Sequence, residues 1–122
     1  MVKKYDFTNE IIEFDGYLML YRIRALKNFG KVKKGDLGGW IEHEGNLSHE
    51  GDCWVYDDAK VYYGAKIYDS AKVYDNAQIY GNVIIDNHSR IYGDVRIFDN
   101  SKTCQQAMTA RGVSSEKYII PF

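Results

Sequence analysis

A run of basic residues between positions 22 and 34 is the first feature that could bind a ligand. No acidic residue interrupts this run before Asp36, and several glycines lie within it and just after it. Cationic side chains and free backbone N–H groups together suit a phosphate or carboxylate. The run therefore predicts an anion-binding site, with a solvated basic loop as the alternative, and its candidate ligand-binding residues are Arg22, Arg24, Lys27, Lys31, Lys33 and Lys34.

Two of these glycines, Gly30 and Gly35, have the spacing of the glycines in a nucleotide-binding phosphate loop. In such a loop the second glycine is followed by Lys and then by Ser or Thr, which hold the phosphate and Mg²⁺. Asp36 and Leu37 occupy those two positions here. The sequence therefore argues against a nucleotide-hydrolysing site.

The three histidines are the candidates for proton transfer and metal binding. His88 is the only histidine within the regular hexads. Its polarity and its tolerance of positive φ would equally explain it as a residue at a corner of the chain. His43 and His49 lie six residues apart with glutamates beside them.

A six-residue repeat runs from Val55 to Thr103 and must position these groups. Its first residue is Val or Ile in all eight hexads, its fifth is small, and its fourth is mostly of a type that accepts positive φ. A period of six does not keep one face of a helix inward. The hexads are also too short for hairpin strands. The repeat predicts a solenoid of short strands and tight corners, with three hexads in each triangular coil and positive φ at the fourth position.

Residues 18 apart should then stack in three inner columns along the solenoid. Upstream, Ile41, Leu47 and Cys53 keep the period of six but are two residues out of step with Val55. This predicts a register slip at Cys53–Val55 and a total of three to four coils. His43 and His49 would lie on different sides, so no metal site is predicted. The expected columns are Val55, Val73 and Ile91; Val61, Ile79 and Ile97; and Ile67, Ile85 and Thr103.

The outer surface of the coils should be aromatic and basic. The residue after each inner aliphatic is Tyr or Phe in seven of eight hexads, and the sixth and last residue of the hexad is Lys or Arg in six of eight. The aromatic rows predict packing between coils, a subunit interface, or both. The candidate interface residues are Tyr56, Tyr74, Tyr92, Tyr62, Tyr80, Ile84 and Phe98.

The hexads resemble the hexapeptide-repeat, left-handed parallel β-helix superfamily. A closer resemblance, over about residues 17–103, is to bacterial and phage β-solenoid repeat proteins that are classed as transferases largely on fold analogy. It is carried by Leu20–Leu26, Gly35–Glu42, Asn46–Ser48 and the Val-Tyr-Asp-Asn-Ala hexads. It implies left-handed coils and side-to-side trimers. It also implies, as an alternative, an acyltransferase that binds acyl-CoA in a groove and uses a His base, for which His88 is the candidate catalytic residue. The unbroken hexads lack the loop that usually builds an acceptor pocket, which weakens that alternative.

The composition argues against several classes of protein. A net charge of -1 over 122 residues argues against nucleic acid as the main partner. No apolar stretch is long enough to cross a membrane, and the N-terminus lacks the apolar segment of a signal peptide. Two cysteines, Cys53 and Cys104, are too few for a secreted disulfide scaffold and suggest reduced thiols in a cytoplasmic protein.

The sequence therefore predicts one all-β structural unit. Residues 1–40 form an N-terminal cap of strands with a hairpin turn at Asp15–Gly16, residues 41–103 form the β-helix, and residues 104–122 form a C-terminal cap. The predicted function is that of an oligomeric, non-catalytic binding or structural module without a cofactor, whose ligand is an anionic small molecule or a protein. Acyl transfer and phage-encoded inhibition or sequestration of a bacterial host factor are the alternatives.

Overall fold

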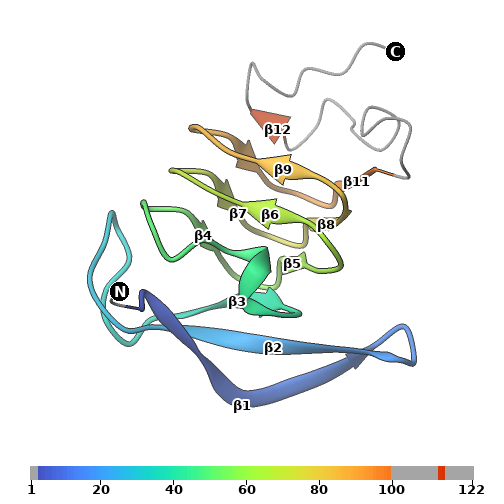
Figure 1. Ribbon diagram of the computed structural model, residues 1–122, viewed down its shortest axis with the longest axis horizontal. Coiled ribbons are helices and arrows are strands. Elements are labelled where there is room, and N and C mark those ends of the chain that lie inside the picture. The colour runs from blue at the N-terminus through green and yellow to red at the C-terminus, as the bar shows by residue number, and fades with distance from the viewer. Residues whose placement is uncertain (1–2, 100–112, 115–122) are drawn as a thin grey trace.

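The computed structural model describes residues 3–99 and 113–114. It is nearly all β-structure, and its parallel coils stack into a solenoid of about three turns above an N-terminal hairpin (Figure 1). The all-β solenoid predicted from the hexads is therefore confirmed. No helix in the described part of the chain is long and apolar enough to span a membrane.

Three sheets form the sides of the solenoid. The first side has the order β12 (Val113–Ser114), β10 (Arg90–Ile91), β7 (Lys72–Val73) and β4 (Trp54–Val55). The second side has the order β1 (Tyr5–Phe14), β2 (Leu18–Ala25), β3 (Leu37–Ile41), β5 (Lys60–Val61), β8 (Gln78–Gly81) and β11 (Arg96–Asp99). The third side pairs β6 (Lys66–Ile67) with β9 (Ile84–Ile85). A 3₁₀ turn, η1 (Glu44–Asn46), follows β3.

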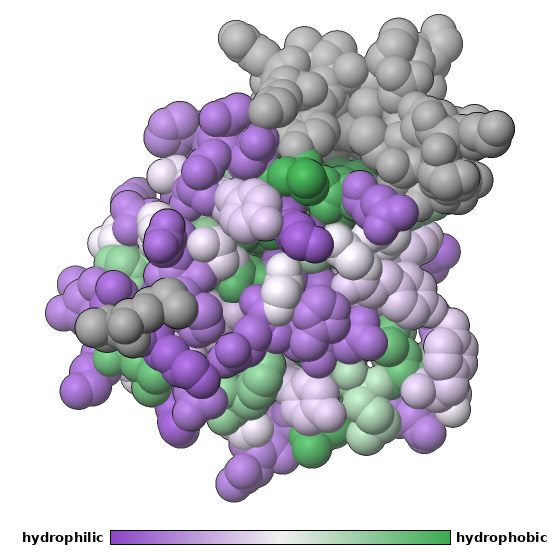
Figure 2. Space-filling model, in the orientation of Figure 1, coloured by the Kyte–Doolittle hydropathy of each residue, from purple (hydrophilic) through white to green (hydrophobic). Residues whose placement is uncertain are grey.

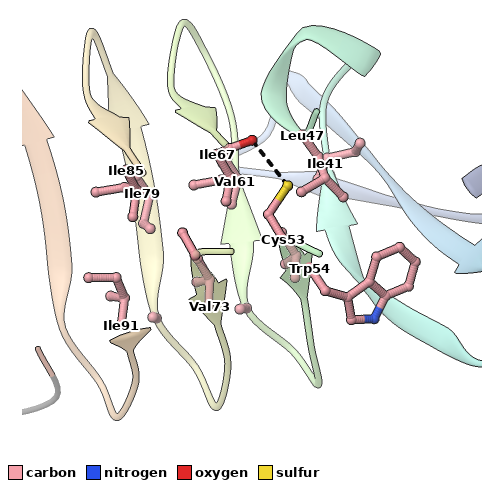
Figure 3. Close-up of a cluster of buried hydrophobic side chains, with 14 of the residues drawn as sticks. Ile41, Leu47, Cys53, Trp54, Val61, Ile67, Val73, Ile79, Ile85 and Ile91 are labelled. Atoms are coloured by element: carbon pink, nitrogen blue, oxygen red, sulfur yellow. Dashed lines mark hydrogen bonds between the residues drawn. The ribbon is translucent and has the colours of Figure 1, made fainter. Parts of the chain in front are cut away.

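The inner columns are those that the period of six predicted. Val55 pairs with Val73, and Val73 with Ile91, each 18 residues further along the chain. The second and third columns are also in register through residue 97, and all eight aliphatic side chains are fully buried (Figure 3). Burial of each such side chain contributes roughly 1.5–3 kcal/mol. Thr103, the expected top of the third column, lies outside the described residues.

At the corners, positive φ occurs one residue earlier in the hexad than the sequence predicted. Positive φ falls at the third position of the hexads, at Asp57, Tyr63, Asp69, Asp75, Gly81, Asn87 and Gly93, and not at the fourth. The physical reason lies in the contacts between coils. The Oδ2 of Asp57 accepts the backbone N–H of Asp75 at 3.1 Å, and Asp75 likewise accepts that of Gly93 at 2.9 Å. An aspartate at the third position thus ties each corner to the corner above it.

The structure contains the register slip but places it before Trp54 and not at Cys53–Val55, because Trp54 and Val55 already pair at the regular offset of 18 with Lys72 and Val73. Ile41 pairs with Val61 and Leu47 with Ile67, which are offsets of 20 residues where the later coils have 18. The two extra residues therefore fall between Leu47 and Trp54. Cys53 is buried at this corner, where its Sγ donates to the carbonyl oxygen of Ile67 at 3.5 Å (Figure 3).

The N-terminal hairpin continues the second side of the solenoid. β1 and β2 are antiparallel, and the predicted turn between them has positive φ at Asp15 and Gly16. β2 then pairs with β3, and β3 runs parallel to β5. β3 can pack this close to the first coil because of Gly39, where an added Cβ would lie 2.6 Å from the carbonyl oxygen of Ala59.

Candidate functional site

The first side of the solenoid carries an outward column of cations beside an outward column of tyrosines. On β7 and β10 the buried aliphatic is flanked by Lys72 and Tyr74, and by Arg90 and Tyr92. In the lowest coil, Trp54 takes the place of the cation and is 1% exposed. The cation column therefore begins one coil above this buried indole.

A hollow of about 430 Å³ opens on the first side. It is the candidate functional site, and we call it the groove. Its lining comes from β7, β10, the corner after β4 and a loop of the N-terminal region. The residues that line it are Gly30, Lys31, Tyr56, Asp57, Lys72, Tyr74 and Arg90.

The loop reaches the groove because an aromatic side chain anchors it. The backbones of Phe29 and Val32 bond to each other in both directions, at 3.0 and 2.7 Å, which makes a tight turn around Gly30 and Lys31. The ring of Phe29 packs edge-on against Trp54 with centroids 5.2 Å apart. The Nζ of Lys4 lies 4.8 Å from the centre of the Phe29 ring. This packing sets Lys31 at the edge of the groove.

Lys4 fixes the bottom of the same region. It is fully buried, and its Nζ donates to the carbonyl oxygens of Cys53 at 2.8 Å and of Gly51 at 3.1 Å. Burial lowers the pKa of this ammonium, and burial also raises the pKa of the neighbouring Cys53 thiol. The raised pKa of Cys53 disfavours a reactive thiolate. The contacts of Lys4 with Gly51 and Cys53 therefore have a structural role, because they join the N-terminal segment to the first coil.

The tyrosines of the groove offer both ring faces and hydroxyl donors. Tyr56 and Tyr74 meet edge to face with centroids 5.7 Å apart, whereas Tyr74 and Tyr92 are stacked at 5.8 Å and 14°. Burial is the main cause that raises the pKa of Tyr56. Its hydroxyl therefore stays protonated at neutral pH and remains a hydrogen-bond donor.

The charge of the groove is mainly positive. Within residues 3–99 and 113–114, no ion pair joins Lys31, Lys72 or Arg90 to a carboxylate. Lys72 donates to the backbone oxygen of Ser70 at 3.1 Å, an uncharged acceptor. The one carboxylate of the lining, Asp57, already accepts the backbone N–H of Asp75. The lining itself therefore holds three cations and one acid, while Asp52 and Asp36 lie near enough to act on Tyr56.

Of the six basic residues proposed from sequence, the structure brings Lys31 alone to the groove lining. Arg22 is held elsewhere, since its Nε donates to Gly38 and its guanidinium lies 5.0 Å from the Trp40 ring. Two ion pairs, to Glu10 at 3.6 Å and Asp58 at 3.9 Å, also engage it. The remaining four are exposed and outside the lining: Arg24, Lys27, Lys33 and Lys34.

Two groove cations, Lys72 and Arg90, were absent from the predicted ligand-binding residues. Their signal in the sequence was the basic residue that precedes the inner aliphatic in most hexads. That signal repeats on every side of the solenoid. It cannot by itself select the side on which an N-terminal loop adds a third cation.

The proposed interface residues are divided among the three sides. Tyr56, Tyr74 and Tyr92 belong to the first side, where the first two line the groove. On the second side Tyr62 is 4% exposed because Phe14 of the hairpin packs on it at 5.3 Å, while Tyr80 and Phe98 are half-buried. On the third side Ile84 is 47% exposed. The face that carries β6 and β9 is mostly hydrophilic with small separate hydrophobic patches (Figure 2).

The histidines occupy three separate places. His88 is exposed at the corner between β9 and β10 and does not line the groove. His43 begins η1, where its Nδ1 accepts the backbone N–H of Gly45. His49 packs under the N-terminal strand. Among the residues that the structure describes, no three His, Cys, Asp or Glu side chains gather as a metal site would need.

His49 is a largely buried titratable group. Its ring stacks on Tyr5 with centroids 4.2 Å apart, and its Nδ1 accepts the backbone N–H of Lys4 at 3.1 Å. Burial lowers its pKa below the usual 6.5, and Lys3 and Lys4 add to this, whereas the Glu44 carboxylate opposes it. The folded protein therefore favours the neutral ring.

We expect the free energy of unfolding to fall as the pH is lowered below about 6.5, because the unfolded chain then takes up a proton that folded His49 resists. This part of the stability is complete above the unfolded pKa and is lost towards the lower folded pKa. Urea denaturation at about pH 7 and about pH 5.5 measures the loss. A His49→Gln variant should show a smaller difference, with His88→Gln as the control. An equal pH dependence in both variants would contradict the role of His49.

Comparison with known proteins leaves the geometry as the guide to function: no protein-family model matches the chain, and no curated protein matches it in sequence.

Proposed function

We propose that the protein is a non-catalytic binding module that holds an anionic ligand with a planar ring in the groove of the first side. The observation that carries this proposal is the set of three cations, Lys31, Lys72 and Arg90, which have no ion pair in the described chain and line the groove together with Tyr74. Unpaired cations on a concave surface attract phosphate and carboxylate groups. The tyrosine rings would contact the apolar part of the same molecule.

The lining of the groove favours binding over acyl transfer. A general base must reach the proton that it removes, and the candidate base His88 does not line the groove. The lining carboxylate, Asp57, is engaged by the backbone of the next coil. Self-association, with a trimer as the expected form, belongs to the same proposal and is supported by the exposure of Ile84 and Tyr68 on the third side.

Phenyl phosphate is a suitable probe because it joins one phosphate to one ring. Isothermal titration at low salt should show that it binds more tightly than inorganic phosphate or phenol. An Arg90→Met variant should weaken this binding by about tenfold, since a hydrogen bond to a charged group contributes about 1.5–3 kcal/mol. Lys66→Met is the matched control, because Lys66 occupies the same hexad position on the third side.

Equal affinity for phenyl phosphate in Arg90→Met and Lys66→Met would overturn the proposal. Native mass spectrometry of freshly isolated protein reports the number of subunits and any retained ligand in one measurement. Turnover of acetyl-CoA that is lost in His88→Ala would support the acyltransferase instead.

A further inference from the structure

His49 is a titratable residue outside the groove, and its two ring nitrogens have different surroundings. Its Nδ1 accepts the backbone N–H of Lys4 at 3.1 Å, so the neutral ring carries its proton on Nε2. This Nε2 is buried without a hydrogen-bond partner among the described residues, and Oε2 of Glu44 lies 3.7 Å from it. The nitrogen that must take up a second proton is therefore the one that already accepts Lys4.

Protonation of His49 makes its contact with Lys4 repulsive. An imidazolium is a donor at both nitrogens, so a new N–H group on Nδ1 would point at the backbone N–H of Lys4. The ring is not free to turn away, because it stacks on Tyr5 with centroids 4.2 Å apart and its side chain is only 11% exposed. Uptake of the proton therefore favours an arrangement in which Lys4 and Tyr5 have moved away.

The charged groups that face His49 act in both directions. Burial lowers the pKa of His49, the ammonium groups of Lys3 and Lys4 lower it further, and the Glu44 carboxylate of η1 raises it. Lys3 also binds Glu44 at 3.0 Å, so one carboxylate serves two cationic groups. Tyr5 remains neutral, since burial raises the pKa of its hydroxyl. The surroundings as a whole therefore favour the neutral ring.

Lys4 and Tyr5 form a short segment, which we call the clasp, that lies against the lowest coil. The Nζ of Lys4 donates to the carbonyl oxygens of Gly51 and Cys53 and lies 3.4 Å from the Sγ of Cys53. The hydroxyl of Tyr5 donates to the carbonyl oxygen of Leu47 at 2.6 Å. Cys53 is fully buried, so movement of the clasp would uncover its thiol.

The clasp also supports the loop that brings Lys31 to the groove. The Nζ of Lys4 lies 4.8 Å from the centre of the Phe29 ring, and Phe29 begins the turn that carries Lys31. The clasp packs against Trp54 as well, with ring centroids 6.2 Å apart, and Trp54 contacts Phe29 at 5.2 Å. Movement of the clasp would therefore remove two supports of this loop.

We propose that His49 makes the clasp an acid-sensitive regulator of the groove: its protonation releases Lys4 and Tyr5, loosens the loop of Lys31 and weakens binding of the anionic ligand. The effect on the ligand rests on the proposed function of the groove, whereas the movement of the clasp can be measured without a ligand. By linkage, the closed clasp is fully stable above about pH 6.5, the pKa of an exposed imidazole. Its stability falls as the pH drops towards the lower pKa of His49 in the closed arrangement.

The accessibility of Cys53 reports the opening of the clasp. In a Cys104→Ser background Cys53 is the only thiol of the chain, and a pyridyl disulfide reagent measures its reaction at about pH 7 and about pH 5. Each rate is divided by that of the same protein unfolded in urea at the same pH, which removes the pH dependence of the thiol chemistry. This relative rate should rise about tenfold at the lower pH, while circular dichroism checks that the protein stays folded.

Two variants test whether His49 causes this opening. His49→Asn keeps an oxygen that can accept the Lys4 N–H but does not titrate, so its relative rate should be equal at both pH values. His88→Asn, at an exposed corner, is the control and should behave as the wild type does. Glu44→Gln should shift the opening to lower pH, because the Glu44 carboxylate raises the pKa of His49.

Isothermal titration with phenyl phosphate tests the connection between the clasp and the groove. The affinity of the wild type divided by that of His49→Asn cancels the ionisation of the ligand, and this ratio should fall several-fold from about pH 7 to about pH 5. By reciprocity, saturating phenyl phosphate should slow the reaction of Cys53 at the lower pH by the same factor.

The proposal is overturned if the Cys53 rate depends on acid equally in the wild type and His49→Asn, or if the affinity ratio stays constant while the rate rises. Should His49→Asn not fold, an unchanged pH midpoint in Glu44→Gln overturns it. Failure of phenyl phosphate to bind at neutral pH would instead contradict the proposed function of the groove, and the reaction of Cys53 would still decide whether the clasp opens.

Discussion

A Val73→Asp variant should not fold. Val73 is fully buried in the middle of its column, with Val55 below and Ile91 above. A carboxylate there would lose its water without gaining a partner, which costs several kcal/mol. Since small domains are stable by only about 5–15 kcal/mol, and the columns are the main core, one such change should suffice. Circular dichroism and thermal unfolding measure the outcome.

The matched control for this variant is Lys66→Asp. It places the same carboxylate beside an inner aliphatic, on the outward and exposed side of β6. This variant should keep the cooperative unfolding transition of the wild type. A soluble Val73→Asp protein that melts as cooperatively as Lys66→Asp would contradict the columnar core.

A Trp54→Ala variant should lose about 3–5 kcal/mol of stability, the usual cost of truncating a large buried aromatic. Trp54 is 1% exposed and joins three parts of the chain. It packs against Tyr5 of β1 with centroids 6.2 Å apart and against Phe29 of the basic loop at 5.2 Å. The cavity left by the indole would therefore loosen both the hairpin and the loop from the first coil.

The same variant should also weaken phenyl phosphate binding, because Lys31 is held at the groove by the contact between Phe29 and Trp54. Urea denaturation gives the change in stability, and titration at a temperature where the variant is folded gives the change in affinity. Leu37→Ala, which truncates an exposed apolar side chain of β3, is the control and should change neither quantity much. A loss of stability below about 1 kcal/mol would contradict the anchoring role, as would wild-type affinity for phenyl phosphate.

The inner columns and the register slip could be predicted because in a strand the type of each side chain records the face that it occupies. Ile67 and Ile85 stack because they are 18 residues apart, and the sequence shows that spacing directly. The positive φ at Asp57 and its equivalents could not be placed as well. The third and fourth positions of the hexad carry similar residue types, so composition does not tell them apart. The contact that distinguishes the third position is a hydrogen bond to a corner 18 residues away.

The sequence by itself determined that this chain is a β-solenoid and which side chains of its strands face inward. It also determined that basic and aromatic residues flank these inward side chains on the outer surface. Only the tertiary structure decided where those residues form sites. Lys31 lines one groove with Lys72 and Arg90 because Phe29 packs on Trp54, and Asp15 lines one hollow with Arg96 because Phe14 of the hairpin packs on Tyr62. Both arrangements depend on irregular segments that cross onto the regular coils. A repeat specifies contacts between its own units, whereas such crossings depend on packing between residues that share no period.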